Sequence, residues 1–286
     1  MLPIALGLGA AACIGVGDFA AGVASRRIAP VLVGFWSQGA ATIASILLLL
    51  VLRPPLEPGQ MPWGLVAGVA TGIGLALLYR AMAAGAISLV APIVACSVIC
   101  PVVFAVATGE TLTPLAAAGV VAMIVGIVLA SLQPGPVPSD PTDTDAAGDR
   151  RAITLAIASA VAFGLFFILI DLSPRSAGWG TLWTASAARA SSFVLQAGLV
   201  LSGPRRIAWP GRVAPAVVSA GILDQVSLVL IGIGTMTNAY GIVTALVGLY
   251  PVVTALLGTI VLGERLTRLQ ATGATLAFVG VMLVSG

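Results

Sequence analysis

Two stretches, one near the end of each half of the chain, decide the fold: GETLTPLAAAGVVAMIVGIVLAS at 109–131 and GERLTRLQATGATLAFVGVMLVS at 263–285. They align without a gap at a constant shift of 154 residues, and 11 of the 23 positions are identical. The identities include G-E-x-L-T-x-L in register, which a shared bias toward small apolar residues does not explain. The sequence therefore predicts an internal duplication.

The composition of the 286 residues is that of a membrane protein. Hydrophobic residues make up 59% of the chain and charged residues 8%, and the mean hydropathy is +1.13. Soluble domains carry about a quarter of charged residues, so this chain cannot cover a water-facing surface. A soluble enzyme, a nucleic-acid binder and a disordered protein are excluded, and the bilayer is the expected environment.

Ten apolar segments can be marked, and each is expected to be a helix because a spanning backbone must satisfy its own hydrogen bonds. Their approximate bounds are 3–24, 30–52, 61–84, 86–108, 113–132, 152–171, 180–202, 213–235, 239–262 and 267–285. Between the fifth and sixth lies the one long connection, 133–151, which holds four prolines and four aspartates and is expected to be an exposed linker. It separates a first five-helix repeat, 1–132, from a second, 152–286.

An odd number of spans per repeat places the second repeat upside down relative to the first, a recurrent plan of secondary transporters. The predicted fold class is an all-α integral membrane protein with ten transmembrane helices, arranged as two inverted five-helix repeats around a central cavity. Because both repeats lie in one chain, we expect a functional monomer.

Five-plus-five helices, with G-E-x-L-T after the fourth and the ninth, resemble the EamA-type members of the drug/metabolite transporter superfamily. The most specific part is the run from Tyr250 and Pro251 to G-E-R-L-T at 263–267, and the opening GVGDFAAGVASRR at 15–27 is also similar to the family's first helix. The first repeat departs from the pattern, because Ser97 stands where Pro251 stands. The resemblance implies a ten-helix secondary transporter that exports small metabolites or drugs, in the inner (cytoplasmic) membrane of a cell.

Three ionisable residues fall inside predicted spans: Asp18, Arg189 and Asp224. Such residues are costly in hydrocarbon and should face the protein interior or a wet cavity. Arg189 and Asp224 could form a structural ion pair between adjacent helices, or one carboxylate could serve as a proton-coupling or substrate-amine site. The sequence alone supports both interpretations.

Other polar and aromatic side chains extend the predicted substrate cavity, since mixed linings of this kind suit an amphipathic organic solute. The candidates are Asn238, Tyr240, Tyr250, Ser97 and Trp36, beside Asp224, Arg189 and Asp18, and Gln38 is a further polar residue in the second span. Pro92, Pro101 and Pro251 free backbone carbonyls in mid-helix and are the candidate hinge or kink residues.

The G-E-x-L-T motif itself reads as a structural turn. Thr113 followed by proline suits a helix N-terminus, and Thr267 with Gln270 suits a capping box. Glu110 and Glu264 are then interfacial turn residues, with a role as gating partners as the alternative.

The chain contains no lysine and no histidine, which removes a Walker A loop and histidine-based metal or acid-base sites. We therefore expect a transporter that is not an enzyme, needs no cofactor or metal, binds no nucleic acid, and takes a small-molecule substrate within the lipid bilayer. Proton coupling is one option, and a lipid flippase or an uncoupled facilitative permease is the alternative.

Arginine positions also predict the orientation in the membrane. Ten arginines flank the side that holds the 133–151 linker, and two, Arg53 and Arg175, flank the side that holds both termini. Cytoplasmic loops are the arginine-rich ones, so the termini are expected outside. Members of the resembling family are often drawn the other way.

Overall fold

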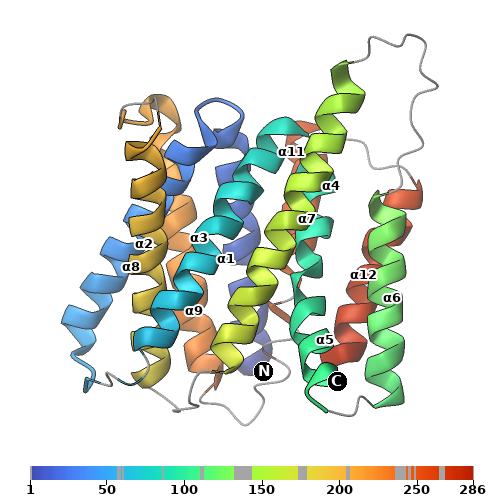
Figure 1. Cartoon of the computed structure of the whole chain (residues 1–286), viewed down its shortest axis with the longest axis horizontal. Coiled ribbons are helices and arrows are strands. Elements are labelled where there is room, and N and C mark those ends of the chain that lie inside the picture. The colour runs from blue at the N-terminus through green and yellow to red at the C-terminus, as the bar shows by residue number, and fades with distance from the viewer. Residues whose placement is uncertain are drawn as a thin grey trace.

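The computed structural model describes residues 2–56, 59, 61–85, 87–109, 113–131, 144–172, 179–203, 207–235, 243, 246–247, 249–263 and 268–285. Within these ranges the regular elements are helices, running alongside one another in one bundle (Figure 1). The first half contains α1 (Leu2–Ser25), α2 (Pro30–Leu52), α3 (Met61–Ala84), α4 (Ile87–Ala95), the 3₁₀ turn η2 (Cys96–Val98), α5 (Ile99–Ala107) and α6 (Pro114–Ser131). The second contains α7 (Thr144–Asp171), α8 (Trp179–Leu201), the 3₁₀ turn η3 (Gly211–Val213), α9 (Ala214–Thr235), α11 (Tyr250–Leu262) and α12 (Arg268–Ser285).

Five helical segments of the described residues are long and apolar enough to cross a membrane: Leu2–Ser25, Pro30–Leu52, Met61–Ala84, Arg150–Ile170 and Gly211–Gly234. Their outward faces carry large hydrophobic side chains such as Ile43, Leu47, Val161 and Ile222. A face of this kind is stable in lipid but not in water. The chain is therefore a multi-pass membrane protein.

Two predicted elements differ in detail from the observed ones. Residues 144–151, assigned from the sequence to the exposed linker, already belong to α7; the early aspartate in TDAAGDRR suits the positive end of a helix dipole. The fourth predicted span, 86–108, is interrupted by η2 at Cys96–Val98. Pro101 has no N–H to donate to the carbonyl of Ser97, which explains why the α-helical pattern breaks there.

The helices of the two halves contact one another in a reciprocal pattern. Matching them in chain order pairs α1 with α7, α2 with α8, α3 with α9, η2–α5 with α11, and α6 with α12. Under this exchange the α1–α9 contact becomes α7–α3, the α3–α8 contact becomes α9–α2, and the α1–α11 contact becomes α7–α5; all six are present. The α2–α8 and α6–α12 contacts map onto themselves and are also present.

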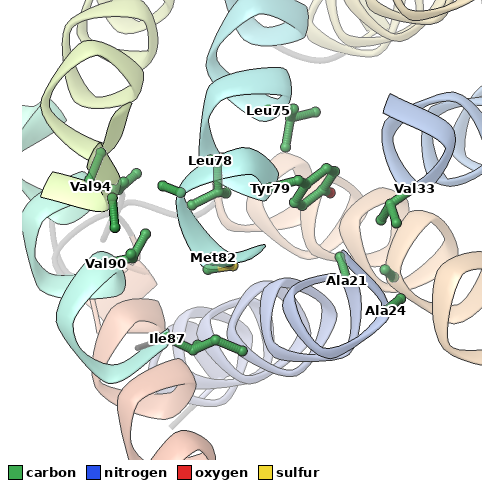
Figure 2. Packing of buried hydrophobic residues seen from close by; sticks show 14 of the residues in the cluster. Ala21, Ala24, Val33, Leu75, Leu78, Tyr79, Met82, Ile87, Val90 and Val94 are labelled. Atoms are coloured by element: carbon green, nitrogen blue, oxygen red, sulfur yellow. The ribbon is translucent and has the colours of Figure 1, made fainter. Parts of the chain in front are cut away.

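Close helix approach depends on small residues, as in other membrane bundles. A Cβ atom added at Gly68 of α3 would lie 2.0 Å from Ser191 Oγ and 2.1 Å from the Ala188 carbonyl oxygen of α8. The Gly64, Gly68 and Gly72 face therefore serves to pack α3 against α8. Deeper in the bundle, Figure 2 shows Leu75, Leu78, Tyr79 and Met82 of α3 packed near α1 and α4.

Candidate functional site

A cavity of about 170 Å³ lies between α1, α2, α3, α7, α8, α9 and α11. Its wall combines helices from both halves of the chain. The polar side chains that line it are Asp18, Ser37, Gln38, Thr71, Tyr79, Arg189, Asp224, Ser227 and Tyr250. Phe163, Phe166 and Phe167 of α7 add an aromatic wall. Polar groups that converge on one apolar, partly aromatic pocket are typical of a small-molecule site.

Arg189 of α8 and Asp224 of α9 form an ion pair in this wall, with Arg189 Nη1 at 2.5 Å from Asp224 Oδ2. The Arg189 side chain is 9% exposed, whereas that of Asp224 is 30% exposed. Thr42 Oγ1 donates to the Arg189 carbonyl oxygen at 3.1 Å, which ties α2 to the same region. The pair therefore neutralises both charges and leaves the aspartate as the more accessible partner.

Asp18 of α1 lines the same cavity and has no ion-pair or hydrogen-bond partner among the described residues. Two nearby glycines allow α1 to approach the other walls. A Cβ at Gly17 would lie 3.2 Å from the Ala220 carbonyl oxygen of α9, and one at Gly15 would lie 2.7 Å from the Tyr250 carbonyl oxygen. Asp18 is thereby held within electrostatic range of Asp224, Tyr79 and Tyr250.

Among the described residues, three buried polar atoms of the cavity lining have no hydrogen-bond partner: Gln38 Oε1, Thr71 Oγ1 and Arg189 Nε. Their residues are 1%, 8% and 7% exposed. Leaving a buried polar atom unpaired costs about 1–3 kcal/mol, and such atoms in a native structure call for an explanation. A ligand or water in the cavity would supply the missing partners.

The predicted cavity residues divide into three groups. Asp18, Arg189, Asp224 and Tyr250 are brought together as lining residues. Ser97 is 1% exposed and lies in η2, and its carbonyl oxygen faces Gly164 of α7. It does not line the cavity. Asn238 and Tyr240 lie outside the described residues.

Trp36 lies elsewhere, in a groove of about 410 Å³ on the outer side of α2, α8 and α9. Phe35, Phe193 and Trp209 line the same groove, and the Trp36 ring packs edge-on against Trp209 with ring centroids 5.0 Å apart. Trp36 Nε1 donates to the Ala208 carbonyl oxygen at 2.9 Å. No charged side chain is among the described residues that line this groove.

The sequence analysis did not predict Tyr79, Thr71 and Ser37 as lining residues. It noted Gln38 as a polar residue but did not assign it to the cavity. Tyr79 is one of three tyrosines in the chain and is 3% exposed. Its neighbour Arg80 is a charged residue close to the end of the third predicted span, which indicates a position at the membrane interface. A tyrosine in an otherwise aliphatic and glycine-rich segment was the available signal. Thr71 and Ser37 carry no pattern that separates a lining residue from a packing one.

Of the hinge candidates, Pro251 is buried in the first turn of α11, and Pro101 lies in the first turn of α5 directly after η2. At the shift of 154 residues, the η2 residues 96–98 correspond to 250–252, where α11 begins. The two halves are thus interrupted at equivalent places, beside the cavity residue Tyr250. Pro92 lies within α4, which continues through it.

The turn motifs are described only in part. Gly109 and Gly263, which open the two G-E-x-L-T motifs, have φ values of 99° and 67°, a backbone conformation that favours glycine. Thr113 precedes α6, and its carbonyl oxygen accepts a hydrogen bond from the Ala117 N–H at 2.9 Å. Glu110, Glu264 and Thr267 lie outside the described residues. Within the described residues, no group of three or more cysteine, aspartate or glutamate side chains is placed to hold a metal ion.

Comparison with known proteins places these features in a family. The model of the EamA-like transporter family matches residues 1–132 and 150–286. Fourteen chains of solved structures match; one, described as the crystal structure of a protein, is 20% identical, with 96% of this chain and 94% of that chain aligned at a TM-score of 0.61. That likeness concerns the fold. A search of curated proteins gave no match.

Proposed function

Since the chain belongs to the EamA-like transporter family, we propose that it is a secondary active transporter that exports a small organic solute by alternating access. The central cavity is its substrate site. The observation that carries the proposal is the meeting of Asp18 from the first half with the Arg189–Asp224 pair from the second half around one cavity. A site built from both halves changes its access when the halves move relative to each other.

The proposed architecture is ten transmembrane helices in two inverted repeats. The reciprocal contact pattern supports it, because exchanging the two halves maps the main helix contacts onto one another. The course of the chain supports the inversion: α1 and α7, the first helices of the two halves, start at opposite ends of the bundle (Figure 1). The repeats would rock around the cavity, with the interruptions near Pro101 and Pro251 as flexible points.

The energy source we propose is a proton gradient that acts through a cavity carboxylate. A sequence without lysine cannot form a Walker A loop, so ATP does not drive this chain by that route. Between the two cavity carboxylates, the geometry favours Asp18 for the coupling role, because Asp224 is held by Arg189 whereas Asp18 has no ion-pair or hydrogen-bond partner among the described residues. A carboxylate without a partner can gain and lose a proton during each cycle at little structural cost.

A lipid flippase is the second candidate, and the outer groove beside Trp36 and Trp209 is the observation that favours it. A flippase must carry a polar headgroup through the membrane core. The described lining of the groove offers no charged side chain for that headgroup, whereas the central cavity is lined by Asp18, Arg189 and Asp224. We therefore favour the central cavity and a soluble substrate.

The test is transport by the purified monomer reconstituted into liposomes. Vesicles loaded with a mixture of amino acids, sugars, nucleosides and organic cations are given a pH gradient, and the solutes that leave are identified by mass spectrometry. The wild type is expected to deplete at least one solute in a gradient-dependent way, and Asp18→Asn to abolish that dependence. Arg212→Gln, which removes an exposed charge on the α8–α9 connection, is the matched control. Depletion of labelled lipid from one leaflet, with every soluble compound retained, would favour the flippase.

A further inference from the structure

The charges around the central cavity do not balance. Its described lining holds two carboxylates, Asp18 and Asp224, and one guanidinium, Arg189. Arg189 and Asp224 neutralise each other, so the charge of Asp18 remains. Burying an uncompensated charge is costly. The cavity therefore needs either a proton on Asp18 or a positive charge from outside.

The surroundings of Asp18 fit an organic ammonium group. Gln38 Oε1 is an unpartnered acceptor on a residue that is 1% exposed, and Gln38 lines the same cavity. The aromatic side chains of Tyr79, Tyr250 and the α7 phenylalanines form another part of the wall, beside aliphatic side chains. Ring faces attract ammonium groups, and an apolar ring in the ligand would pack against them. No third carboxylate or thiolate among the described lining residues is available to complete a shell for a divalent metal ion.

Resting on the proposed function, we propose that the substrates are compact organic cations with one ammonium group, which compete with a proton for Asp18. Asp18 holds the ammonium or the proton, never both. One cation leaves as one proton enters, so the exchange moves no net charge. The cavity of about 170 Å³ is smaller than the roughly 300–1,000 Å³ of drug-sized sites, which limits the solute to about one aromatic ring.

The other polar groups that line the cavity are an ion pair, two tyrosine phenols and uncharged hydroxyl and amide groups. Asp224 on α9 stays paired with Arg189 on α8. Tyr79 on α3 and Tyr250 on α11 are neutral phenols at physiological pH. From α2 the lining side chains are Ser37 and Gln38, which do not titrate. Asp18 is therefore the group whose protonation sets the occupancy of the site.

Three matched probes test the charge requirement: benzylammonium, benzyl alcohol and benzoate, which share the ring and differ in charge. Binding is followed as a shift in the unfolding temperature of the purified protein, since a ligand that binds the native state stabilises it. We expect benzylammonium to stabilise the wild type at high pH and to lose effect as the pH falls, with no shift from the other two. A preference for benzoate or benzyl alcohol overturns the proposal.

Flux in liposomes tests the exchange itself. Benzylammonium movement should follow an imposed pH gradient and stay unchanged when valinomycin and potassium set a membrane potential. Asp18→Asn should lower gradient-driven flux at least tenfold, Asp18→Glu should retain it, and Arg212→Gln should match the wild type. A flux that follows the membrane potential, or that survives in Asp18→Asn, contradicts the one-for-one exchange.

A second variant keeps the proposal falsifiable if Asp18→Asn does not fold. Gln38→Leu retains the carboxylate and removes the unpartnered acceptor, so it should weaken benzylammonium binding several-fold; unchanged binding counts against the site. If a pH gradient drives the flux of a neutral or anionic solute, the proposed function is supported and the organic-cation proposal alone is refuted. If the folded wild type moves none of the solutes, both fail.

Discussion

Arg189 Nη1 lies 2.5 Å from Asp224 Oδ2, and this contact joins α8 to α9 at the wall of the central cavity. The Arg189 residue is buried at 7% exposure, and its Nε atom has no hydrogen-bond partner in the part of the chain that the structure describes. A buried guanidinium depends on its counter-charge far more than a surface one does. The pair joins α8 to α9, and Asp18 is the cavity carboxylate that takes no part in it.

Breaking this pair should destabilise the protein more than removing it whole. Arg189→Met leaves Asp224 without a counter-charge, and loss of one partner of a buried pair costs about 3–5 kcal/mol. The double variant Arg189→Met/Asp224→Asn removes both charges and should recover part of the loss, giving a coupling of about 1–3 kcal/mol. The measurement is the unfolding temperature in detergent, with the exposed Arg212→Met as control. Additive losses from the two single variants would show that the pair contributes no coupling.

The glycine face of α3 should tolerate no side chain at Gly68. Gly68→Ala places a methyl group 2.0 Å from Ser191 Oγ and 2.1 Å from the Ala188 carbonyl oxygen, which forces α3 and α8 apart. We expect a lower unfolding temperature and a lower yield of monodisperse protein. Gly198→Ala on α8 is the matched control, because nothing lies within 4 Å of its added Cβ; it should be neutral or stabilising by up to about 1 kcal/mol. Equal behaviour of the two variants would refute the close packing.

The helix interruptions at equivalent places predict a kinetic effect. Pro101→Ala restores an N–H that can donate to the Ser97 carbonyl, which should extend the α-helix through Cys96–Val98. A stiffer helix should slow exchange several-fold while solute binding stays the same, since Ser97 does not line the cavity. Pro114→Ala, at the exposed start of α6, should leave both unchanged. Unchanged exchange rates in Pro101→Ala and in Pro251→Ala would remove the hinge role.

The orientation of the chain is testable with reporter fusions. In Figure 1, α1 begins and α12 ends at the same end of the bundle. The arginine distribution, ten against two, predicts that this end faces outward. A phosphatase fused after Gly286 should then be active outside, and a fused fluorescent protein should be dark. A fluorescent fusion with an inactive phosphatase would reverse the orientation.

Sequence patterns predicted the helical bundle well because hydrophobicity alone dictates which segments enter a membrane. The predicted span 61–84 coincides with α3 at Met61–Ala84, and 30–52 coincides with α2 at Pro30–Leu52. The interruption at Cys96–Val98 was not resolved, because a proline signals a lost hydrogen bond but not how the neighbouring turn adapts. The helical start of α7 was missed because proline and aspartate dominate the composition of the linker.

The charged residues of the site could be predicted because a charge is costly in a membrane. Asp18, Arg189 and Asp224 stood out as charges in apolar spans, and all three line one cavity. Trp36 is amphipathic and suits a lipid-facing groove as well as it suits a central cavity. The residue type therefore could not show which of the two pockets it lines. Thr71 and Tyr79 line the cavity because of how α3 is rotated about its axis. The contacts of the α3 glycines with α8 set this rotation, and no local sequence pattern predicts it.

Alternating access requires the central cavity to open to each side of the membrane in turn. The reaction of a cysteine introduced into the cavity wall with a thiol reagent tests this directly. Cys13, Cys96 and Cys100 are replaced by alanine, and a single cysteine is introduced by Ser227→Cys, at a buried residue that lines the cavity. Ser159→Cys is the control, because Ser159 is 0% exposed and lies in the α3–α7 contact, where its Oγ donates to the Gly74 carbonyl oxygen at 2.8 Å. A membrane-impermeant thiol reagent is then applied from either side of sealed vesicles, with the pH gradient imposed in each direction. We expect S227C to react from both sides, the gradient to shift the ratio of the two rates, and S159C to stay unlabelled. Reaction from one side alone, under both gradients, would contradict it.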